Sequence, residues 1–330
     1  MTFPSALRYR RRRGPDSERT WMSEPVVLIS HEMLAPVQQL LEAQGFRVAR
    51  RWDLTDADRA EVRAIVHAGE VVLTPDFLAS LPKLGLVACV SVGYDGVDVA
   101  WCRANGIEVT HAKGLNAEDV ADHALGLLIA SWRNIVVGDR VVREGRWRND
   151  DRMGPRPGLA GRKVGIVGLG AIGEAVARRV EACGMTVAWW GPNPKEAAWP
   201  RADSVLALAA DSDVLVVACR ADTANRGLIS KAVIEAVGPK GLIVNVARGA
   251  IIDEDALIAA LKDGRLGRAA LDVFADEPTP VERWEDVPGT VLTPHTAGGT
   301  VESIPRMVAQ AIDNVRRFLA GEPVASPAAG

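Results

Sequence analysis

Residues 163–173 read Lys163-Val-Gly-Ile-Val-Gly168-Leu-Gly170-Ala-Ile-Gly173, a short apolar run followed at once by the pattern Gly-x-Gly-x-x-Gly. A helical pattern over residues 174–182 comes directly after it. A glycine pattern between a strand and a helix is typical of a turn that binds the pyrophosphate of a dinucleotide. The first glycine permits the tight turn, the second lets the backbone approach the phosphates, and the third lets the helix pack close to the strand. The candidate cofactor contacts are therefore Gly168, Gly170, Ala171, Ile172 and Gly173.

Similar apolar runs follow this motif and precede it. The later series lies at residues 186–190, 214–218, 242–245, 269–272 and 290–293, and the earlier one at residues 26–29, 46–49, 71–74, 86–92 and 107–110. Helical patterns occur at residues 33–43 and 117–131 and at about residues 301–319, and the charged residues 143–162 connect the two series. Nearly continuous apolar runs that alternate with helices are typical of buried parallel strands. The chain is therefore predicted to be α/β, with two doubly wound parallel sheets.

The composition is that of a globular protein and narrows the possible partners. The chain has 330 residues, which is enough for two domains. Of these residues 48% are apolar and 25% are charged. A net charge of -3 gives no general attraction to nucleic acid or to an anionic membrane. No apolar run reaches the roughly 18 residues that span a bilayer. The four cysteines lie far apart, which predicts neither a disulfide nor a metal site. We expect a cytoplasmic protein with no nucleic acid, membrane or metal partner.

The first twenty residues differ from the rest in charge. Six arginines against Asp16 and Glu18 give +4 there, which leaves -7 for the remainder. Residues 14–19 are polar, whereas a twin-arginine export signal needs an apolar stretch after the arginines. We expect residues 1–24 to form a disordered N-terminal tail. An over-extended start, with the true initiator at Met22, and a phosphate-binding arm are the alternatives.

The acidic residue that normally follows the second strand of a dinucleotide fold is absent. NAD enzymes usually carry Asp or Glu roughly 20 residues after the glycines, where it binds the adenosine ribose hydroxyls. This chain has Trp190-Gly-Pro-Asn-Pro-Lys195 there, so Gly191 stands in place of the acid. A 2′-phosphate would meet no repulsion at that point, and Asn193 and Lys195 are candidate contacts to it, although no arginine stands where one would be ideal. The pattern favours NADP over NAD. The alternative is that Lys195 is an ordinary solvated lysine.

Three polar side chains follow the last three expected strands. Arg248 comes after residues 242–245, Glu277 after residues 269–272, and His295 after residues 290–293. Ligands of open α/β sheets bind beyond the carboxyl ends of the strands, so all three side chains are expected at the ligand-binding edge of the sheet. Arginine grips a carboxylate bidentately, and a histidine held protonated by a carboxylate donates a proton at neutral pH. With hydride from a nicotinamide, this set would reduce a 2-keto acid.

Four motifs occur in a characteristic order and spacing. They are the glycine motif, Asn245-Val-Ala-Arg-Gly-Ala-Ile-Ile-Asp-Glu-Asp-Ala-Leu257, Asp276-Glu-Pro278 and Thr293-Pro-His295. In these features the chain resembles the D-isomer-specific 2-hydroxyacid dehydrogenase family from residue 25 onward. Ser91-Val-Gly-Tyr-Asp95 and residues 116–122 and 295–300 look most like the glyoxylate/hydroxypyruvate reductases and the related hydroxyphenylpyruvate reductases.

The resemblance implies roles for individual residues. Arg248 would bind the substrate carboxylate and polarise the carbonyl, and His295, held by Glu277, would be the proton donor. Asp272 would hydrogen-bond the nicotinamide carboxamide. Val92 and Gly93 match the loop whose backbone N–H groups face the substrate carboxylate.

The resemblance also implies an architecture, a cofactor and an assembly. A Rossmann cofactor domain at residues 122–301 would be inserted into a flavodoxin-like substrate domain at residues 25–121 and 302–330. Several such reductases prefer NADPH, in agreement with Gly191, but Pro192 stands where they often carry arginine, so NAD stays open. The expected protein is a homodimer acting on a small 2-keto or 2-hydroxy acid.

Other functions are possible on this fold. Formate or phosphite oxidation is disfavoured, because formate enzymes of this fold carry glutamine where this chain has Glu277. A nicotinamide-sensing protein similar to the family's corepressors would keep the same three residues. Another 2-hydroxyacid dehydrogenase, such as D-3-phosphoglycerate or D-lactate dehydrogenase, is a further alternative. The natural keto acid and the physiological direction are left open. We expect His31, His67, His111 and His123 to be ordinary surface or core histidines, although His123 lies on the helix near the domain junction.

Overall fold

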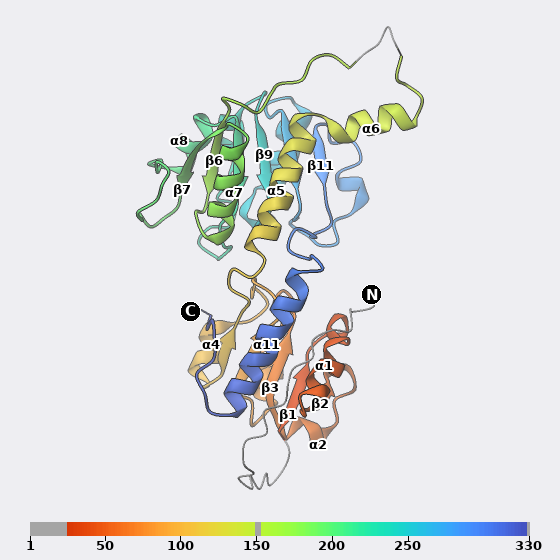
Figure 1. Ribbon diagram of the computed structural model, residues 1–330, viewed down its shortest axis with the longest axis vertical. Coiled ribbons are helices and arrows are strands. Elements are labelled where there is room, and N and C mark those ends of the chain that lie inside the picture. Colours follow the sequence, from red (N-terminus) through yellow and green to blue (C-terminus); the bar gives the residue numbers. More distant parts are fainter. Residues whose placement is uncertain (1–24, 149–152, 329–330) are drawn as a thin grey trace.

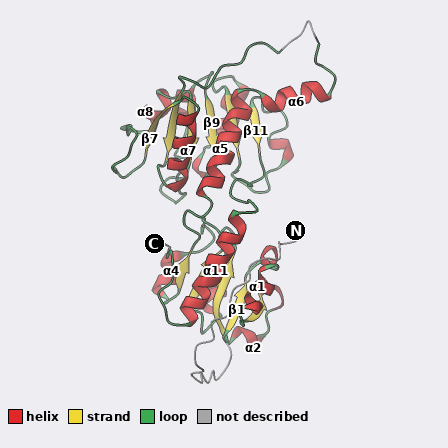
Figure 2. Cartoon of the chain, in the orientation of Figure 1, coloured by secondary structure: helices red, strands yellow, loops and turns green. Residues whose placement is uncertain are grey.

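The computed structural model of the protein describes residues 25–148 and 153–328 and contains two parallel sheets, each with helices packed against it (Figure 1). In Figure 2 the two sets of strands lie one above the other, with long helices crossing each set. The α/β class with two parallel sheets is confirmed. The expected tail at residues 1–24 lies outside the described residues.

The first sheet has the strand order β2-β1-β3-β4-β5. Its strands are β1 (Val26–Ile29), β2 (Arg47–Arg50), β3 (Val62–His67), β4 (Leu86–Cys89) and β5 (Glu108–Thr110). Its helices are α1 (Val37–Ala43), α2 (Asp56–Arg59), α3 (Pro75–Ala79), α4 (Val99–Ala104) and α11 (Ser303–Leu319). The order 2-1-3-4-5 is that of flavodoxin-like folds, in which ligands bind at the carboxyl ends of the strands.

The expected strand at residues 71–74 is wrong. Val72 is 64% exposed, and Leu73 makes only an isolated bridge to Val97. The segment is a loop that ends at Thr74, whose hydroxyl caps α3. The third strand is instead β3, in which only Arg63 is exposed. The charged Arg63 and the buried His67 interrupt the apolar run, and so the pattern alone conceals a strand that lies at the centre of the sheet.

The second sheet has the strand order β11-β10-β9-β8-β6-β7. Its strands are β6 (Lys163–Val167), β7 (Thr186–Trp190), β8 (Val214–Val217), β9 (Leu242–Asn245), β10 (Arg268–Leu271) and β11 (Thr290–Leu292). Arg201 forms a parallel bridge with Trp189 beside β7. If this bridge is taken as the remnant of a third strand, the order is 3-2-1-4-5-6-7: the 3-2-1-4-5-6 of dinucleotide-binding sheets, with the switch point beside β6, followed by β11 as a seventh strand.

The helices of the second sheet cover both faces. They are α5 (Ala117–Trp132), α6 (Ile135–Arg143), α7 (Ala171–Ala182), α8 (Val205–Ala210), α9 (Lys231–Val237) and α10 (Glu254–Lys262). Helix α5 packs along α7 and over β9 and β10. Helix α7 begins three residues earlier than the sequence pattern indicates, so residues 171–173 of the glycine motif form its first turn.

Two helices lie where the chain passes between the sheets. The buried residues Val120 and Ala121 of α5 belong to the core of the second sheet, so the expected boundary at residues 121/122 falls inside α5. Helix α11 follows the second sheet in sequence but packs against β3 and β4 of the first sheet. The division into an inserted cofactor domain and a discontinuous substrate domain therefore stays a proposal, which the placement of α11 supports.

No single helix among the described residues is long and apolar enough to cross a membrane, although α5 and α6, bent by 61°, pass that test as a pair by length and composition.

Candidate active site

The glycine motif forms an open turn at the carboxyl end of β6. Gly168 has a φ of +93°, and a Cβ there would lie 2.5 Å from the Cα of Cys219. A Cβ on Gly173 would collide with the carbonyl of Gly168, so only glycine lets α7 pack this close to β6. A Cβ on Gly170 would meet no atom within 4 Å. Gly170 therefore borders open space just before the N-terminus of α7, where no side chain caps the helix. Free N–H groups at such a helix start suit a pyrophosphate.

The expected ribose-binding position lies at the end of β7. Gly191 is buried there, and Arg201 donates two hydrogen bonds to its carbonyl oxygen, at 2.8 Å from Nη2 and 3.3 Å from Nε. Lys195 forms an ion pair with Glu174 in the first turn of α7, with 2.5 Å between Nζ and Oε1, while Asn193 is exposed. The sequence contained no sign that Arg201 lies here, because ten residues separate it from Gly191 and only the bridge beside β7 brings it back.

Arg248, Glu277 and His295 come together at one edge of the second sheet. They follow β9, β10 and β11, which are neighbours in the sheet and parallel, so their carboxyl ends meet. A Cβ on Gly249 would collide with the carbonyl of Phe274, so the loop that carries Arg248 touches the loop that carries Glu277. The expectation that the three residues share an edge is therefore met by the geometry.

His295 and Glu277 form a close pair. His295 Nδ1 lies 2.6 Å from Glu277 Oε2, and Glu277 Oε1 accepts a hydrogen bond of 2.9 Å from the backbone N–H of Phe274. The hydrogen bond to Glu277 raises the pKa of His295 above its ordinary value, against the opposing effect of burial. Burial acts to raise the pKa of Glu277, but the hydrogen bonds from His295 and Phe274 outweigh it and the pKa is lowered. The pair therefore favours an imidazolium beside a carboxylate.

Arg248 reaches from the second sheet to the loops of the first. Its Nε lies 2.7 Å from Asp95 Oδ2, and its Nη2 lies 3.5 Å from Glu70 Oε1. A Cβ on Gly93 would collide with Nη2 of Arg248, so the guanidinium lies directly on the backbone of the Gly93 loop. Buried Asn245 holds the base of the Arg248 loop through Ala247 N–H and the Arg248 carbonyl. The structure thus brings together Arg248 and Gly93, which the sequence places far apart.

The Val92 end of this loop is held by an aromatic pair. The Val92 carbonyl oxygen lies 2.9 Å from His111 Nδ1, and the ring of Tyr94 meets the ring of His111 edge-on at 4.8 Å. His111 therefore supports the loop that carries the predicted substrate contacts.

Asp272 is a support for the His295 loop. Its side chain is 1% exposed and accepts hydrogen bonds from the hydroxyl of Thr293 and from the N–H groups of Thr296 and Ala297. His295, between them, has a φ of +51°, a conformation that is costly for a residue with a side chain. The anchors on both sides hold it there. The predicted contact between Asp272 and a nicotinamide carboxamide stays a prediction.

Two further residues support these loops: His123, which the sequence placed near the domain junction without a role, and Glu254, which the sequence did not single out. His123 Nε2 lies 2.9 Å from Thr293 Oγ1 and 3.4 Å from Asp272 Oδ1, so this histidine also supports the His295 loop. Glu254 is buried and accepts a hydrogen bond of 2.9 Å from Ala275 N–H, which anchors the Glu277 loop. The sequence does show a glutamate within the run from Asn245 to Leu257, but its helical position alone does not reveal a buried anchor.

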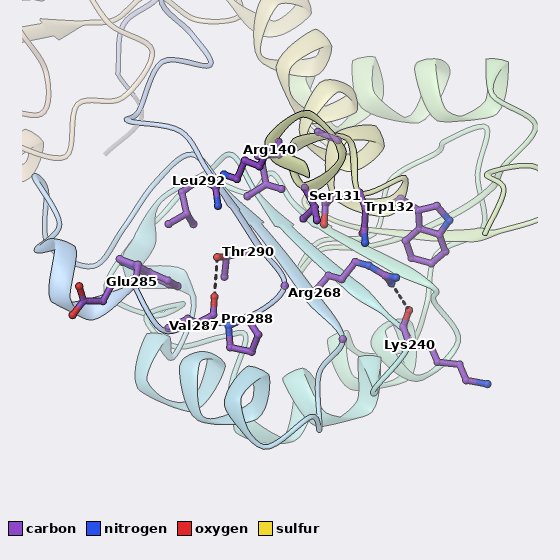
Figure 3. A pocket seen from close by; sticks show the side chains of 18 of the residues that line it. Ser131, Trp132, Arg140, Lys240, Arg268, Glu285, Val287, Pro288, Thr290 and Leu292 are labelled. Atoms are coloured by element: carbon purple, nitrogen blue, oxygen red, sulfur yellow. Dashed lines mark hydrogen bonds between the residues drawn. The ribbon is translucent and has the colours of Figure 1, made fainter. Parts of the chain in front are cut away.

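A cavity of about 1120 Å³ lies at the opposite end of the second sheet (Figure 3). Ser131 and Trp132 at the end of α5, Arg268 at the start of β10, and Thr290 at the start of β11 line it. It is bounded by the amino ends of these strands, whereas Arg248, Glu277 and His295 lie beyond carboxyl ends. This cavity is therefore separate from the candidate active site.

Comparison with known proteins places the chain in a family. The family described as "D-isomer specific 2-hydroxyacid dehydrogenase, NAD binding domain" matches residues 125–297. The hydroxyphenylpyruvate reductase of Plectranthus scutellarioides is 36% identical over 306 residues, which are 89% of this chain and 97% of that protein. Glyoxylate/hydroxypyruvate reductase A of Arabidopsis thaliana is 35% identical over 89% of this chain and 97% of its own length. The NADPH-dependent glyoxylate/hydroxypyruvate reductase of Sinorhizobium meliloti, solved with NADP and malonate, has a TM-score of 0.86 and 33% identity over 93% of this chain and 97% of that one.

Proposed function

Because the chain belongs to the D-isomer-specific 2-hydroxyacid dehydrogenase family, we propose that it reduces small 2-keto acids, such as glyoxylate and hydroxypyruvate, to D-2-hydroxy acids with NADPH. As a member of this family it is an NAD(P)-dependent oxidoreductase that acts on the CH–OH group of 2-hydroxy acids. The names of the similar reductases support the choice of substrate. The observation that carries the proposal is the His295–Glu277 pair beside Arg248.

The proposed roles follow from where the side chains point. NAD(P)H, when bound along the glycine turn, supplies the hydride. Arg248 binds the substrate carboxylate through its planar fork, in exchange for its contacts with Asp95 and Glu70. Glu277 occupies Nδ1 of His295, so Nε2 is the nitrogen that faces the first sheet and donates a proton to the keto oxygen. Supporting contacts from Asp272 and Gly249 hold the loops in this arrangement.

Turnover tests the proposal directly. Purified protein with NADPH and glyoxylate or hydroxypyruvate is expected to lose NADPH absorbance at a rate that saturates with the keto acid. A panel that adds pyruvate, phosphohydroxypyruvate and hydroxyphenylpyruvate, run with both cofactors, distinguishes the other dehydrogenases of the family. Tight cofactor binding without turnover of any 2-keto acid would instead favour the nicotinamide-sensing protein.

Replacing Glu277 with glutamine is expected to shift the pH profile of reduction toward acid. Glu277 raises the pKa of His295, so its loss lowers that pKa. Reduction needs the imidazolium, and activity is therefore lost at a lower pH on the alkaline side than in the wild type. The measurement is kcat/KM for glyoxylate against pH. Asp276→Asn, one residue away, is the matched control and is expected to leave the profile unchanged. An alkaline limb that does not move in Glu277→Gln would show that the two groups are not coupled.

The proposed preference for NADPH rests on the surroundings of Gly191. NADH loses up to two charge-assisted hydrogen bonds that an acid would supply, each worth about 1.5–3 kcal/mol. A 2′-phosphate would meet Arg201 and, after its release from Glu174, Lys195. Because both cations are exposed, each contact is worth only about 0.2–1 kcal/mol. We therefore expect kcat/KM to be higher with NADPH than with NADH, chiefly because no acidic residue is present to bind the ribose hydroxyls of NADH.

Arg201→Ala is expected to weaken NADPH binding by about two- to fivefold and to leave NADH binding nearly unchanged, since only NADPH carries the 2′-phosphate. Binding is followed by the fluorescence of the reduced nicotinamide, because Arg201 lies 5.8 Å from the ring of Trp189 and its removal would itself change tryptophan emission. Arg265→Ala removes an arginine that pairs with Glu235 and Asp263 on the surface, and serves as the control. Equal weakening of both cofactors would remove Arg201 from the phosphate site, and a higher kcat/KM with NADH in the wild type would contradict the reasoning on Gly191.

The assembly and location remain part of the proposal. Ile135, Val137 and Val142 of α6 are about half exposed, which would suit contact with a second copy of the chain. The expectations of a homodimer, of a cytoplasmic location and of no nucleic acid or membrane partner stay predictions from the sequence.

A further inference from the structure

Glu70 lies in the loop that follows β3 of the first sheet, next to the loops that carry Arg248 and His295 of the second sheet. Its Oε1 lies 3.5 Å from Arg248 Nη2 and 3.7 Å from His295 Nε2. These are the two groups that a 2-keto acid has to contact, the first with its carboxylate and the second with its keto oxygen. A carboxylate of the protein therefore borders the position of the reacting part of the substrate.

The backbone fixes Glu70 in this place. A Cβ on the preceding residue, Gly69, would collide with the Gly93 carbonyl, so the two loops touch. Ser91 Oγ accepts a hydrogen bond of 3.0 Å from Gly69 N–H and donates one of 2.7 Å to the Gly93 carbonyl. Gly96 N–H donates to the Gly69 carbonyl at 2.8 Å. The loop of Glu70 and the loop of Gly93 are therefore joined by several contacts.

Within residues 25–148 and 153–328, the one arginine or lysine paired with Glu70 is Arg248. The charged groups that act on His295 are Glu277, Glu70 and Arg248. Arg248 is also shared with Asp95. Another arginine close to this loop, Arg220, donates to the hydroxyl of Tyr94 and lies 5.2 Å from its ring. A substrate carboxylate that takes Arg248 displaces Glu70 from the guanidinium, and the displaced carboxylate would then face the part of the substrate beyond the keto carbon.

We propose that Glu70 determines substrate specificity by charge: it admits 2-keto acids whose far end is neutral or donates hydrogen bonds, and it excludes those with a second negative charge. This inference rests on the proposed function and narrows its substrate class. A hydroxyl on the far carbon donates a hydrogen bond to the Glu70 carboxylate, whereas a phosphate or second carboxylate meets like-charge repulsion. The side chain of Glu70 is 49% exposed, so solvent screens its interaction with a single charge to a few-fold in kcat/KM. A phosphate ester carries nearly two negative charges, so we expect about tenfold, which corresponds to ~1.4 kcal/mol.

Hydroxypyruvate and its 3-phosphate ester form a matched pair of substrates for the test. They share the carboxylate, the keto group and the carbon skeleton and differ in the charge at the far end. The ratio of their kcat/KM values within one enzyme cancels any change in the pKa of His295, because both substrates use the same proton donor. Glu70→Gln is expected to raise this ratio, phosphate ester over hydroxypyruvate, by about tenfold. High salt is expected to reduce that difference.

Two further variants separate charge from other effects. Glu70→Asp keeps the charge and is expected to retain the ratio of the wild type. Glu181→Gln removes one negative charge from the far end of α7, about 16 Å along the helix from Gly170, and is expected to leave the ratio unchanged. A ratio that differs by less than twofold between the wild type and Glu70→Gln would overturn the proposal, as would an equal rise in Glu181→Gln.

A measurement without substrate distinguishes failure of this inference from failure of the proposed function. The pKa of His295 is followed by NMR, with its signal assigned as the one missing from His295→Gln. Glu70→Gln is expected to lower that pKa, since the negative charge of Glu70 favours the imidazolium. An unchanged pKa would remove Glu70 from the site and overturn the inference. Absence of turnover with every keto acid in the wild type would overturn the proposed function, whatever the pKa measurement gives.

Discussion

Replacing His295 with glutamine is expected to lower kcat by about 10²- to 10⁴-fold, the usual contribution of a general acid. Glutamine has a similar length and keeps a polar end beside Glu277, but it cannot donate a proton to the keto oxygen. The loop should keep its shape, because Asp272 holds Thr296 and Ala297 through backbone N–H groups that the substitution leaves in place. Single-turnover reduction of glyoxylate at saturating NADPH measures the effect on the chemical step.

His123 is the control for this experiment. It is a second histidine at the same edge, with Nε2 at 2.9 Å from Thr293 Oγ1, but it supports the loop and faces Asp272. His123→Gln is expected to lower kcat less than His295→Gln does. Cofactor affinity, measured by tryptophan fluorescence, should be nearly unchanged in both. Near-normal turnover in His295→Gln, or a larger loss in His123→Gln, would assign the proton to another group.

Replacing Arg248 with glutamine is expected to lower kcat/KM for glyoxylate by about 10²- to 10⁴-fold, because the substrate carboxylate loses two charge-assisted hydrogen bonds of about 1.5–3 kcal/mol each. The loss should fall mainly on KM, with a further effect on kcat if the fork also polarises the carbonyl. Removing the cation also leaves Asp95 and Glu70 without their partner, and their negative charges then repel the substrate.

Arg248→Lys separates the charge from the planar fork. Lysine keeps the charge but offers no bidentate geometry, so its kcat/KM should lie between those of the wild type and Arg248→Gln. Arg220→Gln removes an arginine that donates to the Tyr94 hydroxyl and is expected to have a smaller effect. A KM for glyoxylate that stays within a few-fold of the wild type in Arg248→Gln would show that the carboxylate binds elsewhere.

The sequence alone was enough for the parts of the protein whose chemistry is local. The three glycines of the motif are needed for local reasons within one strand–turn–helix unit. The structure shows a positive φ at Gly168, open space at Gly170 and close helix packing at Gly173. Arg248, Glu277 and His295 were predicted to lie together because parallel strands that follow one another in α/β folds end at one edge. The flavodoxin-like and Rossmann architectures were implied by the family resemblance and not by the periodicity of the chain.

Only the tertiary structure shows the contacts between loops of the first and second sheets, and the contact of Arg201 with Gly191 beside β7. Glu70 comes within 3.7 Å of His295, and Asp95 within 2.7 Å of Arg248, across sequence distances of more than 150 residues. Arg201 reaches Gly191 because an isolated bridge returns the chain beside β7. A pattern read along the chain records the periodic burial of each element, but β3 was missed because Arg63 and His67 break that period. The neighbours of a charged loop residue depend on how separate elements pack, and no periodicity along the sequence encodes that packing.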